Sequence, residues 1–188
     1  MTMFQRTILP AFFTVTIACG ESSDAADSSG AGESSGAGES SDAGESTAGG
    51  FDEDATVQRA LAYKTTMTQV NAESRPSQHG LAATVNIWAD DSAMATYLAL
   101  DPAMPGAAAA WDPSAMLVKE HLDADGVVNG LTVMAQGDPD PASGGWWWAR
   151  LDADGTVRET GQVGFCISCH TPAEPVGWAF GVPLDNRP

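Results

Sequence analysis

Three residues near the C-terminal end of the chain, Cys166, Cys169 and His170, have the types and spacing with the most specific chemistry. Two residues between the cysteines allow both thiols to reach the two vinyl groups on one edge of a porphyrin. The next residue, His170, then lies under the ring, where its imidazole binds iron as the proximal ligand. The pattern therefore predicts one haem of the c type, covalently attached by two thioether bonds.

Two other interpretations of the cysteine pair are weaker. A dithiol redox pair usually opens a helix in a βαβ setting, which this chain lacks. A zinc site needs four ligands, and the chain has only three cysteines in all. Haem attachment is favoured because a histidine stands at the one position that it requires.

The third cysteine, Cys19, follows a segment that is typical of an export signal. Residues 1–18 contain Arg6 and then the apolar run 8–17. That run is too short to span a bilayer, which takes about 20 residues. A small residue precedes Cys19, which resembles a bacterial lipoprotein cleavage site. We favour lipidation of Cys19; the alternative is an ordinary signal peptide with an idle cysteine.

These features predict the cellular location of the protein. Haem of the c type is attached outside the cytoplasm, so export and the haem motif agree. Gly20 does not resemble an inner-membrane retention signal. We therefore expect a lipid anchor on the periplasmic side of a bacterial membrane, with the outer membrane as the favoured one.

The composition of residues 19–50, rich in Gly, Ser, Ala and Glu, predicts a disordered, acidic tether. The sequence Ala-Gly-Glu-Ser recurs at Ala31, Ala37 and Ala43 without an aliphatic side chain that could build a core. A flexible chain of this length has an end-to-end distance of about 30 Å. The remaining residues, 51–188, have the size of one domain.

The charge of the protein narrows the choice of partners. The formal net charge is −17 at neutral pH. Such acidity argues against nucleic acid or an anionic membrane surface as a partner. It favours solubility and docking to a basic, soluble redox partner.

The elements that must hold the haem motif are predicted from periodicity, caps and turns. The patterns predict helices over 54–70 and from Asp90 or Asp91 to Leu100, strands over 81–88, 115–122, 127–136, 146–152 and 156–160, a loop over 101–113, and an ordered Pro-rich segment over 172–188. Asp52 or Asp54 caps the first helix. The repeated Leu-Asp-Ala-Asp-Gly is interpreted as turn chemistry, since its glycine is misplaced for a calcium loop.

Alternation along 115–122 places Lys119 and His121 on one face of a strand and Glu120 on the other. From this pattern alone, the favoured interpretation of Lys119 is an exposed side chain on an edge strand. His79, His121 and several methionines are candidates for a sixth iron ligand, although such histidines more often lie on the surface or serve as hydrogen-bonding groups. The run 146–148 consists of three tryptophans, which must point to both faces of a sheet.

Several stretches together resemble the cytochrome P-460 family and its relatives, the cytochromes c′-beta. They are Gln78-His79-Gly80, Met116-Leu117-Val118-Lys119-Glu120, Leu131-Thr132-Val133-Met134, and Trp146-Trp147-Trp148-Ala149 with Asp154-Gly155 before the haem motif. The resemblance covers residues 78–180. The strand that carries Lys119, about 50 residues before the cysteines, is more specific to this family than the haem motif itself.

The resemblance implies an α+β fold, mostly antiparallel sheet with a few helices packed around one covalent haem, and commonly a homodimer. It implies a five-coordinate haem with His170 as proximal ligand. Lys119 falls where hydroxylamine-oxidising members link a lysine nitrogen to a porphyrin meso carbon, which makes it a haem neighbour. Thr132 stands where those enzymes have a distal glutamate, a proton acceptor, and no arginine stands near Ala83, where one is expected.

The leading functional hypothesis is a membrane-tethered mono-haem cytochrome that binds hydroxylamine or nitric oxide at an open iron. Turnover would oxidise the ligand and pass electrons to an outside acceptor, but Thr132 makes deprotonation of hydroxylamine harder. The alternatives are a non-enzymatic gas-binding or electron-transfer cytochrome and a structural lipoprotein without haem. A six-coordinate, low-spin haem would favour electron transfer.

Overall fold

The computed structural model of the chain describes residues 51–188 apart from 79, 104–105, 107 and 139. The predictions for the signal segment, Cys19, the tether and His79 lie outside the described residues. In the part of the chain that is described, no helix combines the length and the apolar character needed to cross a membrane.

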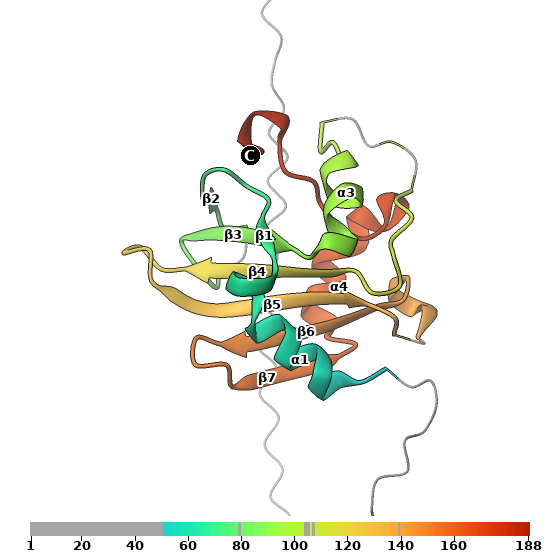
Figure 1. The fold of residues 1–188 in the computed structure, drawn as a ribbon, viewed down its shortest axis with the longest axis horizontal. Coiled ribbons are helices and arrows are strands. Elements are labelled where there is room, and N and C mark those ends of the chain that lie inside the picture. Colours follow the sequence, from blue (N-terminus) through green and yellow to red (C-terminus); the bar gives the residue numbers. More distant parts are fainter. Residues whose placement is uncertain (1–50, 79, 104–105, 107, 139) are drawn as a thin grey trace, which may run out of the picture.

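The described residues form one antiparallel sheet of seven strands with helices packed against it (Figure 1). The strand order is β1-β3-β4-β5-β6-β7, and β2 also pairs with β3. The strands are β1 Thr68–Gln69, β2 Arg75–Pro76, β3 Thr84–Ala89, β4 Met116–Leu122, β5 Val128–Gln136, β6 Trp146–Asp152 and β7 Val157–Gly161. The α-helices are α1 Glu53–Leu61, α2 Tyr63–Thr66, α3 Asp91–Ala99 and α4 Gly164–His170, and the 3-10 turns are η1 Pro141–Ser143, η2 Thr171–Val176 and η3 Leu184–Asn186. The predicted α+β class is confirmed.

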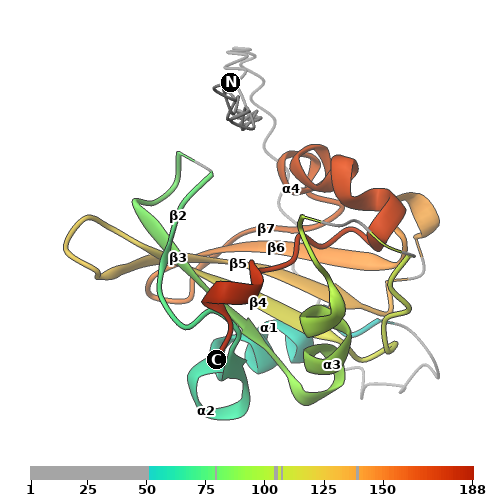
Figure 2. The ribbon, with the colours of Figure 1, turned by 90° about the horizontal axis from the view of Figure 1, so that it is seen from above.

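The sheet separates two hydrophobic clusters, and Figure 2 shows α1 and α4 on opposite sides of it. The α1–α2 side packs Val57 and Tyr63 against Val118 of β4. The other side packs Tyr97 of α3 and Cys166 of α4 into one cluster with residues of β3 to β6. Helices that cover both faces of an antiparallel sheet bury both sets of alternating side chains.

The three consecutive tryptophans divide between these clusters, as predicted. Trp146 and Trp148 belong to the α3–α4 side, and Trp147 belongs to the α1–α2 side. All three are almost completely buried. Because successive side chains of a strand point to opposite faces, β6 contributes large rings to both cores at once.

The first predicted helix is shorter than expected, although its cap is confirmed. Asp52 Oδ1 accepts a hydrogen bond from the Ala55 amide at 2.9 Å and starts α1. The prediction of helix to residue 70 is wrong, since α2 ends at Thr66 and β1 follows it. The hydroxyls of Thr65 and Thr66 donate to the Ala62 carbonyl, and β-branched residues that bond to the backbone are weak helix formers.

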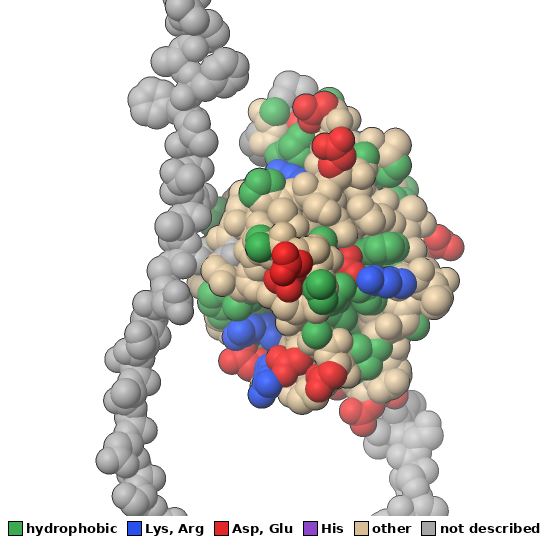
Figure 3. Space-filling view, turned by 90° about the vertical axis from the view of Figure 1, so that its left-hand side faces the viewer, with side chains coloured by type: hydrophobic (Ala, Val, Ile, Leu, Met, Phe, Trp, Pro, Cys, Tyr) green, Lys and Arg blue, Asp and Glu red, His purple; other side chains and the backbone are tan. Residues whose placement is uncertain are grey.

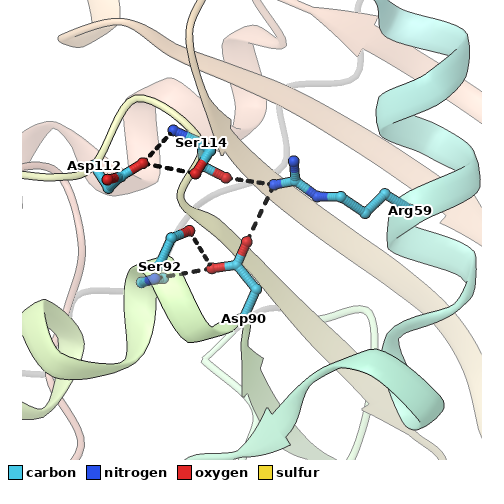
Figure 4. Close-up of polar contacts among 6 residues, drawn as sticks. Arg59, Asp90, Ser92, Asp112 and Ser114 are labelled. Carbon is cyan, nitrogen blue, oxygen red and sulfur yellow. Dashed lines mark hydrogen bonds and ion pairs between the residues drawn. The ribbon is translucent and has the colours of Figure 1, made fainter.

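A polar network joins α1 to the start of α3 and to the chain before β4 (Figure 4). Arg59 donates to Asp90 Oδ2 at 3.2 Å and to the Ser114 carbonyl at 2.6 Å. Asp90 Oδ1 accepts from the Ala93 amide at 2.9 Å, which confirms it as the cap of α3. These contacts fix the entry into β4, the strand that carries Lys119.

The hairpins and the C-terminal segment also agree with their predictions. Asp123 Oδ1 accepts hydrogen bonds from the amides of Asp125 and Val127, which is turn chemistry. Arg187 donates to the carbonyls of Leu98 and Leu100 and so ties the C-terminal segment to the end of α3.

The register of the central strands places Lys119 away from any edge. β4 lies between β3 and β5, so the interpretation of Lys119 as an exposed edge residue is wrong. Lys119 pairs with Thr132 of β5, and Thr132 pairs with Arg150 of β6. Paired residues of neighbouring strands point to the same face, so these three side chains form a row on the α3–α4 side.

Glu120 points to the opposite face, as predicted, and is 2% exposed. It accepts hydrogen bonds from Tyr63 Oη at 2.6 Å and Asn86 Nδ2 at 2.9 Å, and Lys64 Nζ lies 2.6 Å away. Burial raises the pKa of this carboxyl, but the three donors outweigh burial and hold its pKa below the ordinary value. Glu120 therefore links α2 to the sheet and is not available to the Lys119 face.

Acidic and basic side chains are both present on the face drawn in Figure 3. Some lie side by side at its lower left and the others stand apart, and this face shows no extended basic patch. This agrees with the acidic composition of the chain.

Candidate functional site

A cavity of about 180 Å³ lies on the α3–α4 side of the sheet. Lys119 and Thr132 border it from the sheet, and Cys166 and His170 border it from α4. Most of the remaining wall is apolar, including Leu117, Met134, Trp148 and Phe180. The register and α4 thus bring Lys119 and His170, which are 51 positions apart in the sequence, to one cavity.

The helix α4 explains why the haem motif is buried as a unit. Positions i, i+3 and i+4 of an α-helix lie on one face, and Cys166, Cys169 and His170 have this spacing. All three are buried. Burial raises the pKa of the Cys166 thiol to about 11, so this sulfur is a neutral thiol at physiological pH.

The imidazole of His170 is held by one hydrogen bond and two aromatic neighbours. Nδ1–H donates to the Trp178 carbonyl at 2.6 Å, so the proton lies on Nδ1 and the lone pair lies on Nε2. The ring of Trp148 lies edge-on at 4.8 Å between centroids, and that of Phe180 lies at 5.3 Å. The tautomer and the orientation of a metal-ligating imidazole are set in this way in proteins.

The Trp178 carbonyl is itself positioned by an unusual turn. Gly177 has φ 91° and Trp178 has φ 70°, so both lie in the left-handed region. The Gly177 carbonyl accepts hydrogen bonds from Trp111 Nε1 at 2.9 Å and Trp146 Nε1 at 3.2 Å. A Cβ at position 177 would lie 2.6 Å from Trp111 Nε1, which explains glycine there. Two tryptophans therefore support the hydrogen bond to His170.

Lys119 has the properties of a nucleophilic amine. Burial lowers its pKa to about 8, the thiol of Cys166 opposes this decrease, and the positive charge of Arg75 adds to it. The neutral form of the amine, which is the nucleophile, therefore becomes dominant as the pH rises above about 8. Lys119 therefore borders the same cavity as Cys166 and His170.

The candidates for a sixth iron ligand have different locations. Met134 borders the main cavity. His121 borders a second cavity, and its Nε2 lies 3.1 Å from Thr132 Oγ1. His79 lies outside the described residues. Of the two candidate histidines, His121 therefore borders the second cavity and not the main one.

Arg75 is a cavity residue that the sequence patterns do not indicate. The family resemblance leads us to expect an arginine near position 83, which carries alanine. Arg75 of β2 does border the cavity, together with Tyr97. The strand β2 has only two residues, and its pairing with β3 brings the guanidinium to the site. A strand of two residues has no periodicity to detect, so only the fold reveals this arginine.

The residues around the cavity fit a haem of the c type. The donor set is an imidazole with a fixed tautomer and a cysteine pair on one helical face. Trp148 Nε1, which is buried in the cavity wall, has no hydrogen-bond acceptor among the described residues. An apolar wall with a few convergent polar groups is typical of cofactor sites.

Comparison with known proteins identifies the family to which the chain belongs. The family model described as Cytochrome P460 matches residues 61–181, the segment from the end of α1 to the C-terminal wall of the cavity. The chain belongs to the cytochrome P460 family. It is therefore a c-type haem protein, and the resemblance predicted from the sequence is confirmed. A search of curated proteins found no match.

Proposed function

We propose that this member of the cytochrome P460 family is an exported, membrane-tethered mono-haem cytochrome that oxidises hydroxylamine. Cys166 and Cys169 would hold one haem through thioether bonds, and His170 Nε2 would bind its iron. The observation that carries the proposal is that one cavity is bordered by His170, Cys166 and Lys119 together. The bound haem supplies the electron acceptance, which none of these side chains provides.

Lys119 completes the site by bonding to the porphyrin edge. Its amine is buried with a pKa of about 8 and borders the same cavity as Cys166. Formation of a bond from the Lys119 nitrogen to a porphyrin carbon would remove one hydrogen from each partner, and reduction of one hydrogen peroxide to two waters would balance this oxidation. The neutral amine that attacks is favoured by higher pH, so bond formation should increase as the pH rises through about 8.

The wall of the cavity favours a small, uncharged ligand. Its apolar residues exclude strongly hydrated ions, whose desolvation is costly. Hydroxylamine and nitric oxide are both neutral at physiological pH, and both carry a nitrogen donor for iron. Met134 is the side chain on the wall that would compete for the sixth position.

A non-enzymatic, gas-binding role is the second candidate, and one observation favours it. Among the described residues, no Asp or Glu side chain borders the main cavity, and Thr132 occupies the sheet wall beside Lys119. A threonine hydroxyl alone is a poor general base. Binding of nitric oxide needs no proton acceptor, so such a wall suffices for a gas-binding protein.

The tether and the partners form the last part of the proposal. Lipidation of Cys19 anchors the chain on the periplasmic side of the outer membrane, and residues 20–50 hold the haem domain off the lipid surface. The net charge of −17 supports a basic, soluble redox partner as the acceptor of the electrons. The family resemblance supports a homodimer.

The experiment that tests the oxidase proposal measures hydroxylamine turnover by the purified holoprotein with an artificial electron acceptor. We expect steady acceptor reduction by the wild type and a decrease of at least about tenfold in Lys119→Met, equal to 1.4 kcal/mol in the barrier. Haem content, measured in parallel, should be unchanged in the variant. Binding of nitric oxide without any hydroxylamine turnover in the wild type would replace the oxidase with the gas-binding role.

A further inference from the structure

A second cavity of about 110 Å³ adjoins the main cavity at Thr132. Thr132 is the one described residue that borders both cavities. His121, Asp152 and Arg158 border the second one. A water molecule needs roughly 10–15 Å³ of such space, so the second cavity has room for several.

Thr132 and His121 are in direct contact across the strand pair β4–β5. His121 Nε2 lies 3.1 Å from Thr132 Oγ1, and His121 is 2% exposed. His121 pairs with Gly130, and Gly130 pairs with Asp152. A Cβ at position 130 would lie 2.9 Å from the Leu151 carbonyl oxygen, so β5 and β6 approach closely at this glycine. A hydroxyl donates and accepts hydrogen bonds at once, and an imidazole binds protons in the physiological range.

We propose that Thr132 and His121 form a path that removes a proton from a ligand in the main cavity. Thr132 Oγ1 accepts the proton of the ligand while the hydroxyl proton of Thr132 passes to His121 Nε2. One proton enters the pair and one leaves the hydroxyl, so no electrons move and Thr132 is regenerated. This inference rests on the proposed function, since it concerns a ligand bound at the haem.

The second cavity gives the proton a way out. His121, as an imidazolium, faces a space bordered by Asp152, whose carboxylate accepts hydrogen bonds from Arg158. The side chains of Asp152 and Arg158 are 37% and 62% exposed, so this end of the path reaches the surface. Water in the second cavity can then take the proton from His121 and return the pair to its starting state. Arg150 also borders this cavity, and its charge favours release of the proton.

The pair overcomes the weakness of Thr132 as a base. The hydroxyl alone has far too low a proton affinity to hold a proton taken from a ligand. An adjacent imidazole accepts the hydroxyl proton in the same step, as in activation of a hydroxyl by a neighbouring general base. Thr132 is thus the proton carrier at the cavity wall, and His121 is the proton acceptor.

The rates at which cyanide and nitric oxide associate with the ferric holoprotein distinguish an effect on proton transfer from an effect on access of the ligand to the iron. Hydrogen cyanide must lose its proton when its carbon binds iron, whereas nitric oxide carries none. The variants are Thr132→Val, which removes the hydroxyl at nearly constant volume, His121→Gln, and the control Thr132→Ser, which keeps the hydroxyl. We expect cyanide association in Thr132→Val and His121→Gln to slow by about 100-fold, the size of a general-base contribution. Thr132→Ser should bind cyanide at close to the wild-type rate, and nitric oxide should bind all three variants at that rate.

Two results would overturn the inference. One is a cyanide association rate that is the same in Thr132→Val and the wild type. The other is an equal decrease in the association rates of cyanide and nitric oxide, which would show that only access of the ligands to the iron had changed. Neither measurement uses hydroxylamine, so a lack of hydroxylamine turnover would count against the proposed oxidase and not against the proton path. If His121→Gln fails to fold, the Thr132→Val and Thr132→Ser pair still decides the matter.

Discussion

Replacement of both Cys166 and Cys169 by alanine should abolish covalent haem attachment completely. The two cysteines lie on the buried face of α4, and no other described cysteine exists to replace them. Without thioether bonds, haem leaves the polypeptide when the protein unfolds. The measurement is haem staining of a denaturing gel after co-expression with the machinery that attaches c-type haem.

A matched control makes this result specific. Cys19→Ala removes the third cysteine of the chain and should leave the haem stain at the wild-type level. The single variants Cys166→Ala and Cys169→Ala should each keep one bond and show a weaker stain. Retention of covalent haem by the double variant would refute the assignment of both cysteines.

The second large effect is expected at His170. His170→Ala should keep the haem attached through both cysteines and lose the proximal ligand, because Nδ1–H donates to Trp178 and the lone pair that would bind iron lies on Nε2. The absorption spectrum and the spin state of the ferric protein should both change. Added imidazole should restore a large part of the wild-type spectrum, since the deleted ring leaves a space of its own size.

Another histidine provides the control for this experiment. His121→Gln alters an imidazole that borders the second cavity and not the main one, so the wild-type spectrum should persist. A change of spectrum in His121→Gln together with an unchanged spectrum in His170→Ala would reverse the two roles. His121 would then be the ligand of the iron.

Local patterns in the sequence predict much of this fold because the relevant interactions are local. The Asp-Gly turns at 123–126 and 152–155 define the hairpins β4–β5 and β6–β7. Alternation predicts that Lys119 and Glu120 lie on opposite faces, and the bulge follows His121 and so leaves this assignment intact. The helical spacing of the haem motif likewise predicts a shared face.

Features that depend on long-range pairing are not visible in the sequence. The local pattern around Lys119 predicts an edge strand, and only the order of the strands shows that β4 lies in the interior of the sheet. Arg75 reaches the cavity through a two-residue strand, and the contact of His121 with Thr132 depends on the register of β4 with β5. The left-handed turn at Trp178 depends on tryptophans from distant elements, which no local pattern encodes.

The absorption spectrum of the purified holoprotein, oxidised and reduced, followed by its intact mass, shows both whether haem is attached and whether Lys119 is bonded to it. We expect a mass equal to the mature polypeptide plus one haem, less the two hydrogens lost when the Lys119 bond forms. We also expect a broad, strongly red-shifted Soret band in the reduced state, because Lys119 is bonded to the porphyrin. An ordinary high-spin c-type spectrum would remove the Lys119 bond and favour the gas-binding role. A colourless protein with the mass of the polypeptide alone would contradict the account.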